Sequence, residues 1–530
     1  MEKGIAVDSE TFDIGRVEQQ ATLSRNALIY GACALLSVAL GYLLSDPLSF
    51  RSMALVGATM VGVVLPVFLK WYHPILVLSW NASISFFFLP GKPSLAMLMS
   101  LVGFTIALAT RTIRHEAKFL PDRLMTVSLV FLGGVVMITG MLTGGIGSKA
   151  VGSDTYGGKK YYIICLAIMG FFALISRRLP RDRAVFFCYA YFLSTLTAVL
   201  GYAVYFAGPS FYFLFQIFPP EVMALRSLEG IDPSGGGITR WGGFSAAGAA
   251  LCHFLLLRFG VKGLFRFDRP WRGGIFLLCL LVSLLGGFRS VLALIALGFM
   301  IQFFLEGLGR TRYLLLICGG AGLALLLAVM FATQLPLSMQ RAISFLPVEV
   351  DPVAEADAQG STEWRVLMWK RVVPEIPRYF WLGKGYAIDP VDMYFAEEGV
   401  KRGTLRNFEP ALVAGDYHSG PLSTIIPFGI FGLVSFCLVL FAGGRILYRN
   451  YRRGDPGLKQ INTFLFAHFL ARIVFYIAVF GSISSDLHHF LGLVGLSICL
   501  NGGVGGPGVP AKPGSEEADG EKEGIGEAQA

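Results

Sequence analysis

Residues 313–332 read YLLLICGGAGLALLLAVMFA, a run of 20 residues without a charged side chain. A helix rises about 1.5 Å per residue, so this run is long enough to cross about 30 Å of hydrocarbon. Similar apolar runs recur through most of the 530-residue chain, of which 54% is hydrophobic and only 15% is charged. Soluble domains carry about a quarter charged residues. The pattern therefore predicts an all-α polytopic membrane protein.

Membrane-length windows predict about fourteen transmembrane helices, within a range of about 12 to 14. Residues 1–26 are acidic, unlike a cleaved signal peptide, and are predicted to form a cytoplasmic segment. Residues 501–530 are rich in Gly, Pro and Glu, which is typical of a disordered tail. The predicted spans lie near 27–44, 53–69, 74–90, 94–110, 124–142, 161–176, 184–207, 243–257, 274–288, 290–305, 313–332, 421–441, 461–480 and 484–500.

One long polar connection, 333–420, separates eleven predicted spans in 27–332 from three in 421–500. Lysines and arginines gather in alternate short connections, and the positive-inside rule places these connections in the cytoplasm. Both termini are then cytoplasmic, and the long connection is extracytoplasmic, or periplasmic in a bacterial inner membrane. The net charge of +9 reflects these connections and gives no support to nucleic-acid binding. The cation-rich connections contain Arg111–Arg123, Arg177–Arg183, Arg258–Arg272, Arg310–Arg312 and Arg445–Lys459.

The cysteines offer no metal or disulfide signature. All eight fall inside apolar segments, and no CxxC pair occurs in the chain. A structural metal site and a disulfide-stapled connection are therefore not expected.

Two arginines lie next to predicted spans on the predicted outer face. Arg289 sits between two apolar runs, where an arginine either snorkels to the interface or faces an anionic ligand. Arg240 follows the glycines Gly235 to Gly237 and precedes Trp241. Glycine-rich turns can cradle phosphate, but an interface anchor with Trp241 explains the same pattern. Both interpretations stay open for each arginine.

The long connection is predicted to contain a helix over 361–379, with Ser361 or Thr362 as its cap. At helical spacing, Arg365 and Trp369 share one mostly apolar face. Such a face suits a helix that lies on the membrane surface, and equally a helix that packs on the bundle.

His418 is the only histidine in the long connection and comes just before an apolar run. A neutral imidazole can accept a proton from a hydroxyl group near neutral pH. Asp416, two residues earlier, can orient the ring or raise its pKa if the backbone bends suitably.

Five short motifs follow one another between about residues 235 and 435. They are Arg240-Trp241-Gly242-Gly243-Phe244, Gly287-Phe288-Arg289-Ser290, Arg365-x3-Trp369, Leu382-Gly383-x-Gly385, and His418-Ser419-x2-Leu422 followed by Gly429-Ile430-Phe431-Gly432-Leu433. In their order and spacing they resemble the O-antigen ligase/polymerase family of bacterial polysaccharide assembly.

The resemblance implies a glycosyltransferase that takes a glycan from an undecaprenyl-diphosphate carrier. It implies lipid A-core or a growing polysaccharide as the acceptor, with no cofactor and no metal. Arg240, Arg289 and Arg365 would bind the diphosphate, and His418 would activate the acceptor hydroxyl. Asp416, Trp369 and Ser419 would support the site. The family often has Asn where this chain has Ser419, which leaves the hydrogen bond to the acceptor in question.

The sequence is therefore compatible with two classes of function, a glycosyltransferase and a transporter. A ligase and a polymerase use the same donor and differ only in the acceptor. A transporter or flippase of lipid-linked glycans is the alternative, and it would place its arginines along a central path. A large extracytoplasmic connection favours the enzyme, because an activated sugar must be shielded from water.

Overall fold

The computed structural model describes residues 68–86, 89, 91–113, 122–147, 157–220 and 238–505, together with 26–27, 29–38, 41, 62 and 66. The chain divides into two units, Met1–Tyr72 and His73–Ala530. In the first unit, Ile29–Val38 is an apolar helix. The predicted spans at 27–44 and 53–69 lie partly or largely outside the described residues. The predicted N-terminal segment and most of the C-terminal tail also lie outside them.

Helices make up the second unit, and among its described residues the only strand-like pairing is an isolated bridge between Ser85 and Ser94. Eight helical segments of the described chain are long and apolar enough to cross a membrane. The prediction of a multi-pass helical membrane protein is confirmed, whereas the count of about fourteen spans stays a prediction. The segments are α3 (Leu95–Ile113), α4 (Arg123–Thr143), α6 to α7 (Ala184–Ala207), α9 (Gly242–Leu264), α12 with the turn after it (Arg312–Gln334), α18 (Leu422–Arg453), α19 with the turn before it (Pro456–Ala478) and α20 (Ile483–Asn501).

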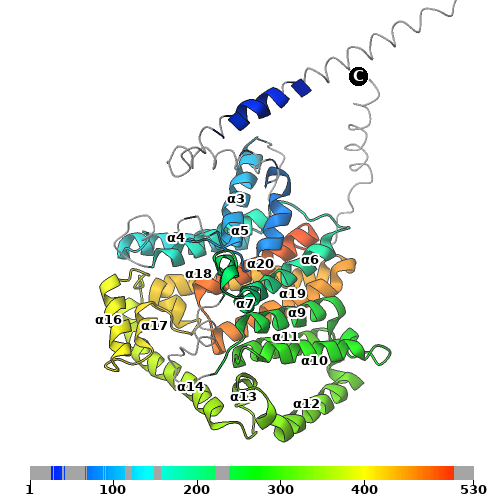
Figure 1. Ribbon diagram of the computed structural model, residues 1–530. Coiled ribbons are helices and arrows are strands. Elements are labelled where there is room, and N and C mark those ends of the chain that lie inside the picture. The colour runs from blue at the N-terminus through cyan, green and yellow to red at the C-terminus, as the bar shows by residue number, and fades with distance from the viewer. Residues whose placement is uncertain are drawn as a thin grey trace, which may run out of the picture. The chain divides into compact units, whose positions relative to one another are not determined.

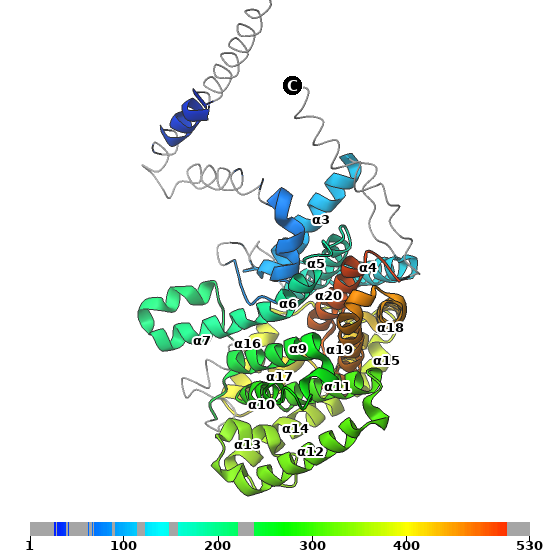
Figure 2. The ribbon, with the colours of Figure 1, turned by 90° about the vertical axis from the view of Figure 1, so that its right-hand side faces the viewer.

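Three further apolar helices are shorter: α5 (Gly158–Leu174), α10 (Trp271–Leu284) and α11 (Arg289–Leu305). Helices α9, α10 and α11 lie side by side in both views (Figures 1 and 2), and α9 contacts both of the others. The sequence placed these helices correctly because length and hydropathy are enough to specify an apolar helix.

The predicted span at 74–90 is wrong in its second half. The helix there ends at residue 79, and residues 81–86 have no regular helix. Polar groups take over the hydrogen bonding: Asn81 Nδ2 donates to Tyr191 O at 2.9 Å, and Ser83 N donates to Thr197 Oγ1 at 2.8 Å. The side chains of Asn81 and Thr197 thus bond to backbone groups where the helix has ended.

Between α12 and α18, the chain folds into one long helix, α14, and several short ones. They are α13 (Leu337–Ile343), α14 (Pro352–Val372), α15 (Ile376–Tyr379), α16 (Pro390–Lys401) and α17 (Glu409–Val413). Figure 1 shows α14, α16 and α17 gathered at the left, at one end of the roughly horizontal apolar helices. The long connection is thus a small helical layer over one end of the bundle.

The helix predicted over 361–379 begins earlier than expected. Asp351, rather than Ser361 or Thr362, caps α14, because its carboxylate accepts a hydrogen bond from Val353 N at 2.8 Å. Pro352 occupies the first helical position, where its missing N–H costs nothing. The corrected start adds Asp357 to this helix.

The apolar face of α14 packs on its own chain. Met368 and Val372 are buried in a cluster with Tyr417, Leu422 and Ile426. This contact joins α14 to the start of α18, so the bundle-packing interpretation holds for this face.

The interior of the bundle contains an ion pair. Arg472 of α19 lies 3.4 Å from the Asp486 carboxylate of α20, and its Nε donates to His468 at 3.4 Å. Ser482 N also donates to Asp486, at 2.9 Å. Charges at such depth persist where each has a partner.

Candidate functional site

Three arginines from separate elements meet beneath α14. Arg240 precedes α9, Arg289 is the first residue of α11, and Arg341 belongs to α13. Gly287 adopts a left-handed conformation, with φ of 68°, in the turn that leads into α11. That turn brings Arg289 under the first half of α14.

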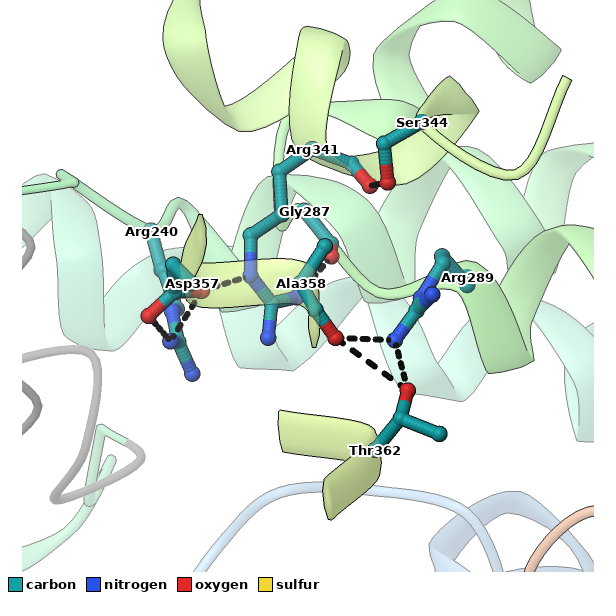
Figure 3. Close-up of polar contacts among 8 residues, drawn as sticks. All are labelled: Arg240, Gly287, Arg289, Arg341, Ser344, Asp357, Ala358 and Thr362. Atoms are coloured by element: carbon teal, nitrogen blue, oxygen red, sulfur yellow. Dashed lines mark hydrogen bonds and ion pairs between the residues drawn. The ribbon is translucent and has the colours of Figure 1, made fainter. Parts of the chain in front are cut away.

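One carboxylate joins two of these arginines (Figure 3). Arg240 Nη2 lies 3.3 Å from each oxygen of Asp357, and Arg341 Nε donates to the same carboxylate. Arg341 Nη1 also donates to the carbonyl of Gly287. The side chains of Arg240, Arg341 and Asp357 are only 11%, 6% and 4% exposed. Asp357 and Arg341 therefore fasten α14 to the turn that carries Arg289.

Arg289 reaches the next turn of α14. Its Nη2 donates to Ala358 O at 2.8 Å and to Thr362 Oγ1 at 3.0 Å. A pocket of about 270 Å³ opens beside it, with Glu355 and Glu363 in its wall. These carboxylates repel an anion on that side. Any anion held by Arg289 is therefore favoured on the side of Arg365.

Arg365 is half-buried on α14 and makes no hydrogen bond or ion pair with any residue in the described part of the chain. Burial lowers its pKa, and the nearby charges of Arg289 and Arg341 lower it further. We call Arg240, Arg289, Arg341 and Arg365, with Asp357, the arginine cluster. Asp357 contacts Arg240 and Arg341 and forms no ion pair with Arg289 or Arg365 among the described residues. A concentration of unneutralised guanidinium charge is suited to bind phosphate oxygens.

His418 lies against the middle of α14, near Arg365. Its ring contacts Trp364 of α14 and Phe480, with centroid distances of 4.9 and 5.0 Å. Its φ is 51°, a left-handed conformation that is uncommon outside glycine. Nδ1 is buried without a hydrogen-bond partner among the described residues. Burial lowers the pKa of His418, Asp416 raises it, and Arg365 and Lys160 lower it. The imidazole is therefore neutral at neutral pH.

The strained turn at His418 is anchored on three sides. Trp369 Nε1 donates to Tyr417 O at 2.8 Å, and Tyr476 OH donates to Gly420 O at 2.8 Å. Lys160 Nζ donates to Ala414 O at 2.7 Å. Backbone strain of this kind persists only where the surroundings enforce it, and it is common at functional sites.

The other predicted supporting residues have different surroundings. Asp416 is exposed and lies 4.0 Å from Lys160 Nζ. It therefore acts on His418 through charge alone, because no hydrogen bond joins the two among the described contacts. The carbonyl of Ser419 accepts a hydrogen bond from Ser423 N at 2.8 Å, which begins the first turn of α18. Gly235 to Gly237 lie outside the described residues.

The glycine motif is a backbone connector. Gly383 and Gly385 have φ of 83° and 71°. Lys384 N donates to Ile426 O at 2.7 Å, and Gly385 N donates to Pro427 O at 2.9 Å. These carbonyls are free because Gly429, with φ of 61° and ψ of −162°, breaks the helical pattern inside α18. The motif thus joins the long connection to the bend in α18.

Sequence reasoning missed Asp357 and Arg341. Asp357 lies eight residues before Arg365 and therefore on a similar face of α14. The pair Asp351-Pro352 was the available signal, since a cap followed by proline marks a helix start. Two acidic residues of α16 and its cap have structural roles. Asp389 caps α16 through Val391 N at 2.8 Å, and Glu398 pairs with Arg402 at 2.9 Å.

Residues 274–437 match a family model described as O-antigen ligase. The matched region runs from α10 into α18 and includes Arg289, Arg365 and His418, whereas Arg240 lies outside it. It is shorter at its N-terminal end than the motif-based estimate of about 235–435. No curated protein matches the chain.

Proposed function

We propose, from the membership of residues 274–437 in an O-antigen ligase-related family, that this multi-pass membrane protein is a glycosyltransferase. The domain and the apolar helices fit a glycosyltransferase-type function in a membrane. The finer proposal is transfer of a glycan from undecaprenyl diphosphate to an acceptor hydroxyl. One observation carries it: Arg365, which is half-buried and unpaired among the described residues, lies between Arg289 and a half-buried, neutral His418.

In this proposal, Arg289 and Arg365 bind the diphosphate of the donor. The contacts of Arg289 with Ala358 and Thr362 hold its guanidinium in place before the donor arrives. Arg240 and Arg341 remain bound to Asp357 beneath α14, and in this proposal they add positive charge near the diphosphate without contacting it. Such preorganised charge stabilises the negative charge that develops on a leaving group. Guanidinium groups would thereby take the place of a divalent metal.

His418 would act as the general base. The neutral imidazole takes the proton of the acceptor hydroxyl as that oxygen forms a bond to the anomeric carbon of the donor sugar. The bond between the anomeric carbon and the diphosphate oxygen breaks, and its electron pair stays on the undecaprenyl diphosphate. Arg289 and Arg365 neutralise that charge. The Trp369 and Lys160 contacts hold the turn that presents His418.

The acceptor in the proposal is lipid A-core or a growing polysaccharide. The site would face the periplasm from a bacterial inner membrane. A strain lacking this protein separates the two acceptors. Lipid A-core without repeat units would indicate a ligase, and lipid A-core with a single repeat unit would indicate a polymerase.

The central test compares Arg365→Ala and His418→Ala with the exposed Arg371→Ala on the same helix. Loss of a charge-stabilising donor or of a general base typically slows an enzyme by about 10²- to 10⁴-fold. Both site variants are expected to lose acceptor-linked glycan and to accumulate lipid-linked donor, while Arg371→Ala resembles the wild type. Wild-type glycan in both site variants would overturn the proposal. Donor translocation by the purified chain without donor turnover would support the transporter instead.

A further inference from the structure

A row of large apolar side chains is exposed on α16, outside the membrane-length helices. Val391, Tyr394 and Phe395 are 55%, 60% and 63% exposed. Their spacing places them on one helical face, which we call the α16 row. Ala396, on the opposite face, is buried. Exposed apolar groups of this size, gathered on one face, mark an interaction surface.

Trp381, which follows α15, is another exposed apolar side chain of the long connection. It is 68% exposed, and its ring lies 6.5 Å from that of Phe431. Phe431 follows the break at Gly429, at the start of the long apolar part of α18. Ile430 N donates to Phe380 O at 2.6 Å, so the backbone before Trp381 is bound to α18 at this level.

The chain that enters α16 lies at the ends of two further apolar helices. Leu382 O accepts a hydrogen bond from Thr139 in the last turns of α4, at 3.1 Å. Tyr386 N donates to Tyr161 OH in the first turn of α5, at 2.9 Å. The approach to α16 therefore contacts the last turns of α4 and the first turn of α5.

We propose that Trp381 and the α16 row contact the lipid bilayer at its surface and dock the helical layer there. Trp and Tyr favour the interface between hydrocarbon and water. A helix with one apolar face lies well in that plane. Asp392, Glu397 and Glu398 against Lys401 give α16 a net charge of −2, so the contact depends on apolar insertion and not on anionic lipids. The proposal is independent of glycan transfer and of which side of the membrane the layer faces.

The test uses the full chain in vesicles of phosphatidylethanolamine and phosphatidylglycerol, with a photoreactive benzoyl-phenylalanine in place of Phe395. The same probe at Phe441, an exposed position within α18, is the lipid-facing control. The probe at Glu397, on the flank of α16, is the water-facing control. We expect lipid adducts at 395 and 441, few at 397, and no change when the phosphatidylglycerol fraction varies.

Two results would overturn the proposal. The first is a lipid-adduct yield at 395 no greater than at 397. The second, in native membranes, is a protein adduct at 395 in place of lipid. The same probe at Tyr394 repeats the measurement at a neighbouring position of the row, so one poorly folded variant does not decide the outcome.

Discussion

One carboxylate contacts two buried arginines beneath α14, and its removal has a predictable cost. Asp357→Asn keeps the shape of the side chain but removes the negative charge that Arg240 and Arg341 both contact. Breaking a buried ion pair by removing one partner costs about 3–5 kcal/mol. We expect a clearly lower melting temperature for the purified variant in detergent. Asp392→Asn, on the exposed side of α16, is the matched control and should melt like the wild type. Equal melting of the two variants would contradict the structural role of Asp357.

With His418 as the proposed general base, its pKa sets the pH dependence of the proposed glycan transfer. Burial holds this pKa below the ordinary value of 6.5, and a general base works only when it is unprotonated. Activity is therefore expected to persist from neutral pH through 6.5 and to fall only at lower pH. Asp416→Asn removes the carboxylate that raises the pKa, so the acid limb should move to still lower pH. Initial rates against pH for both proteins measure this shift; a move to higher pH contradicts the assignment.

At the scale of single residues, the sequence is enough to single out a candidate residue when its type is unusual for its surroundings. Arg289 and His418 stood out as charged or titratable groups beside apolar runs. Asp357 did not, because an acid in a polar segment resembles a solvated surface residue. Its role depends on three elements that meet only in the folded chain. The roles predicted for the site residues stay predictions, and their neighbours are now known.

At the scale of elements, two glycines of the long connection provide a matched pair. Gly383 has φ of 83°, and a Cβ there would collide with the Pro427 carbonyl. Gly360 lies within α14 with open space around it. A side chain forced into a sparsely populated backbone region costs about 1–3 kcal/mol, whereas Gly→Ala inside a helix gains about 0.5–1 kcal/mol.

We therefore expect Gly383→Ala to unfold at a lower temperature than the wild type and Gly360→Ala to unfold at the same temperature or higher. Thermal unfolding of both purified variants in one detergent measures the difference. A Gly383→Ala variant as stable as Gly360→Ala would show that the connector to α18 bears no strain.

The position of a helix could be predicted where a single property, the length of an apolar run, determines it. Apolar length placed both ends of α11 and α12 within one residue of their observed bounds, and it placed the start of α9 but not its end at Leu264. The error at 74–90 arose because Asn81 and Ser83 form hydrogen bonds to partners more than 100 residues away, which hydropathy does not reveal. The predicted start of α14, at residue 361, was too late. The capping residue Asp351 and the following Pro352 mark the true start and are visible in the sequence.

Over the whole molecule, the ends of the helices sort into two sets. The first set of ends contacts the long connection through four side chains. They are Thr139 of α4, Lys160 of α5, Arg289 of α11 and Tyr476 of α19. The opposite ends join one another: Arg445 pairs with Asp122 at 2.6 Å, and Tyr451 OH donates to Leu305 O at 3.1 Å. The described residues of the cation-rich connections lie at this second set of ends. One face of the bundle therefore bears the excess of lysine and arginine, and the candidate site lies at the other.

That sorting makes the membrane orientation testable. The positive-inside rule puts the cation-rich face in the cytoplasm, so the long connection should face outward. Gly403 follows α16 and has open space around it. Its φ of 70° nevertheless disfavours any residue with a side chain at this position. Its exposed neighbour Arg402 is therefore the better position for a cysteine. Arg402→Cys should react with a membrane-impermeant thiol reagent in cells whose outer membrane alone is opened. Asp268→Cys, in an exposed cation-rich turn, should react only after the inner membrane is opened. The reverse order would place the arginine cluster and His418 in the cytoplasm, where a periplasmic glycan acceptor does not reach them.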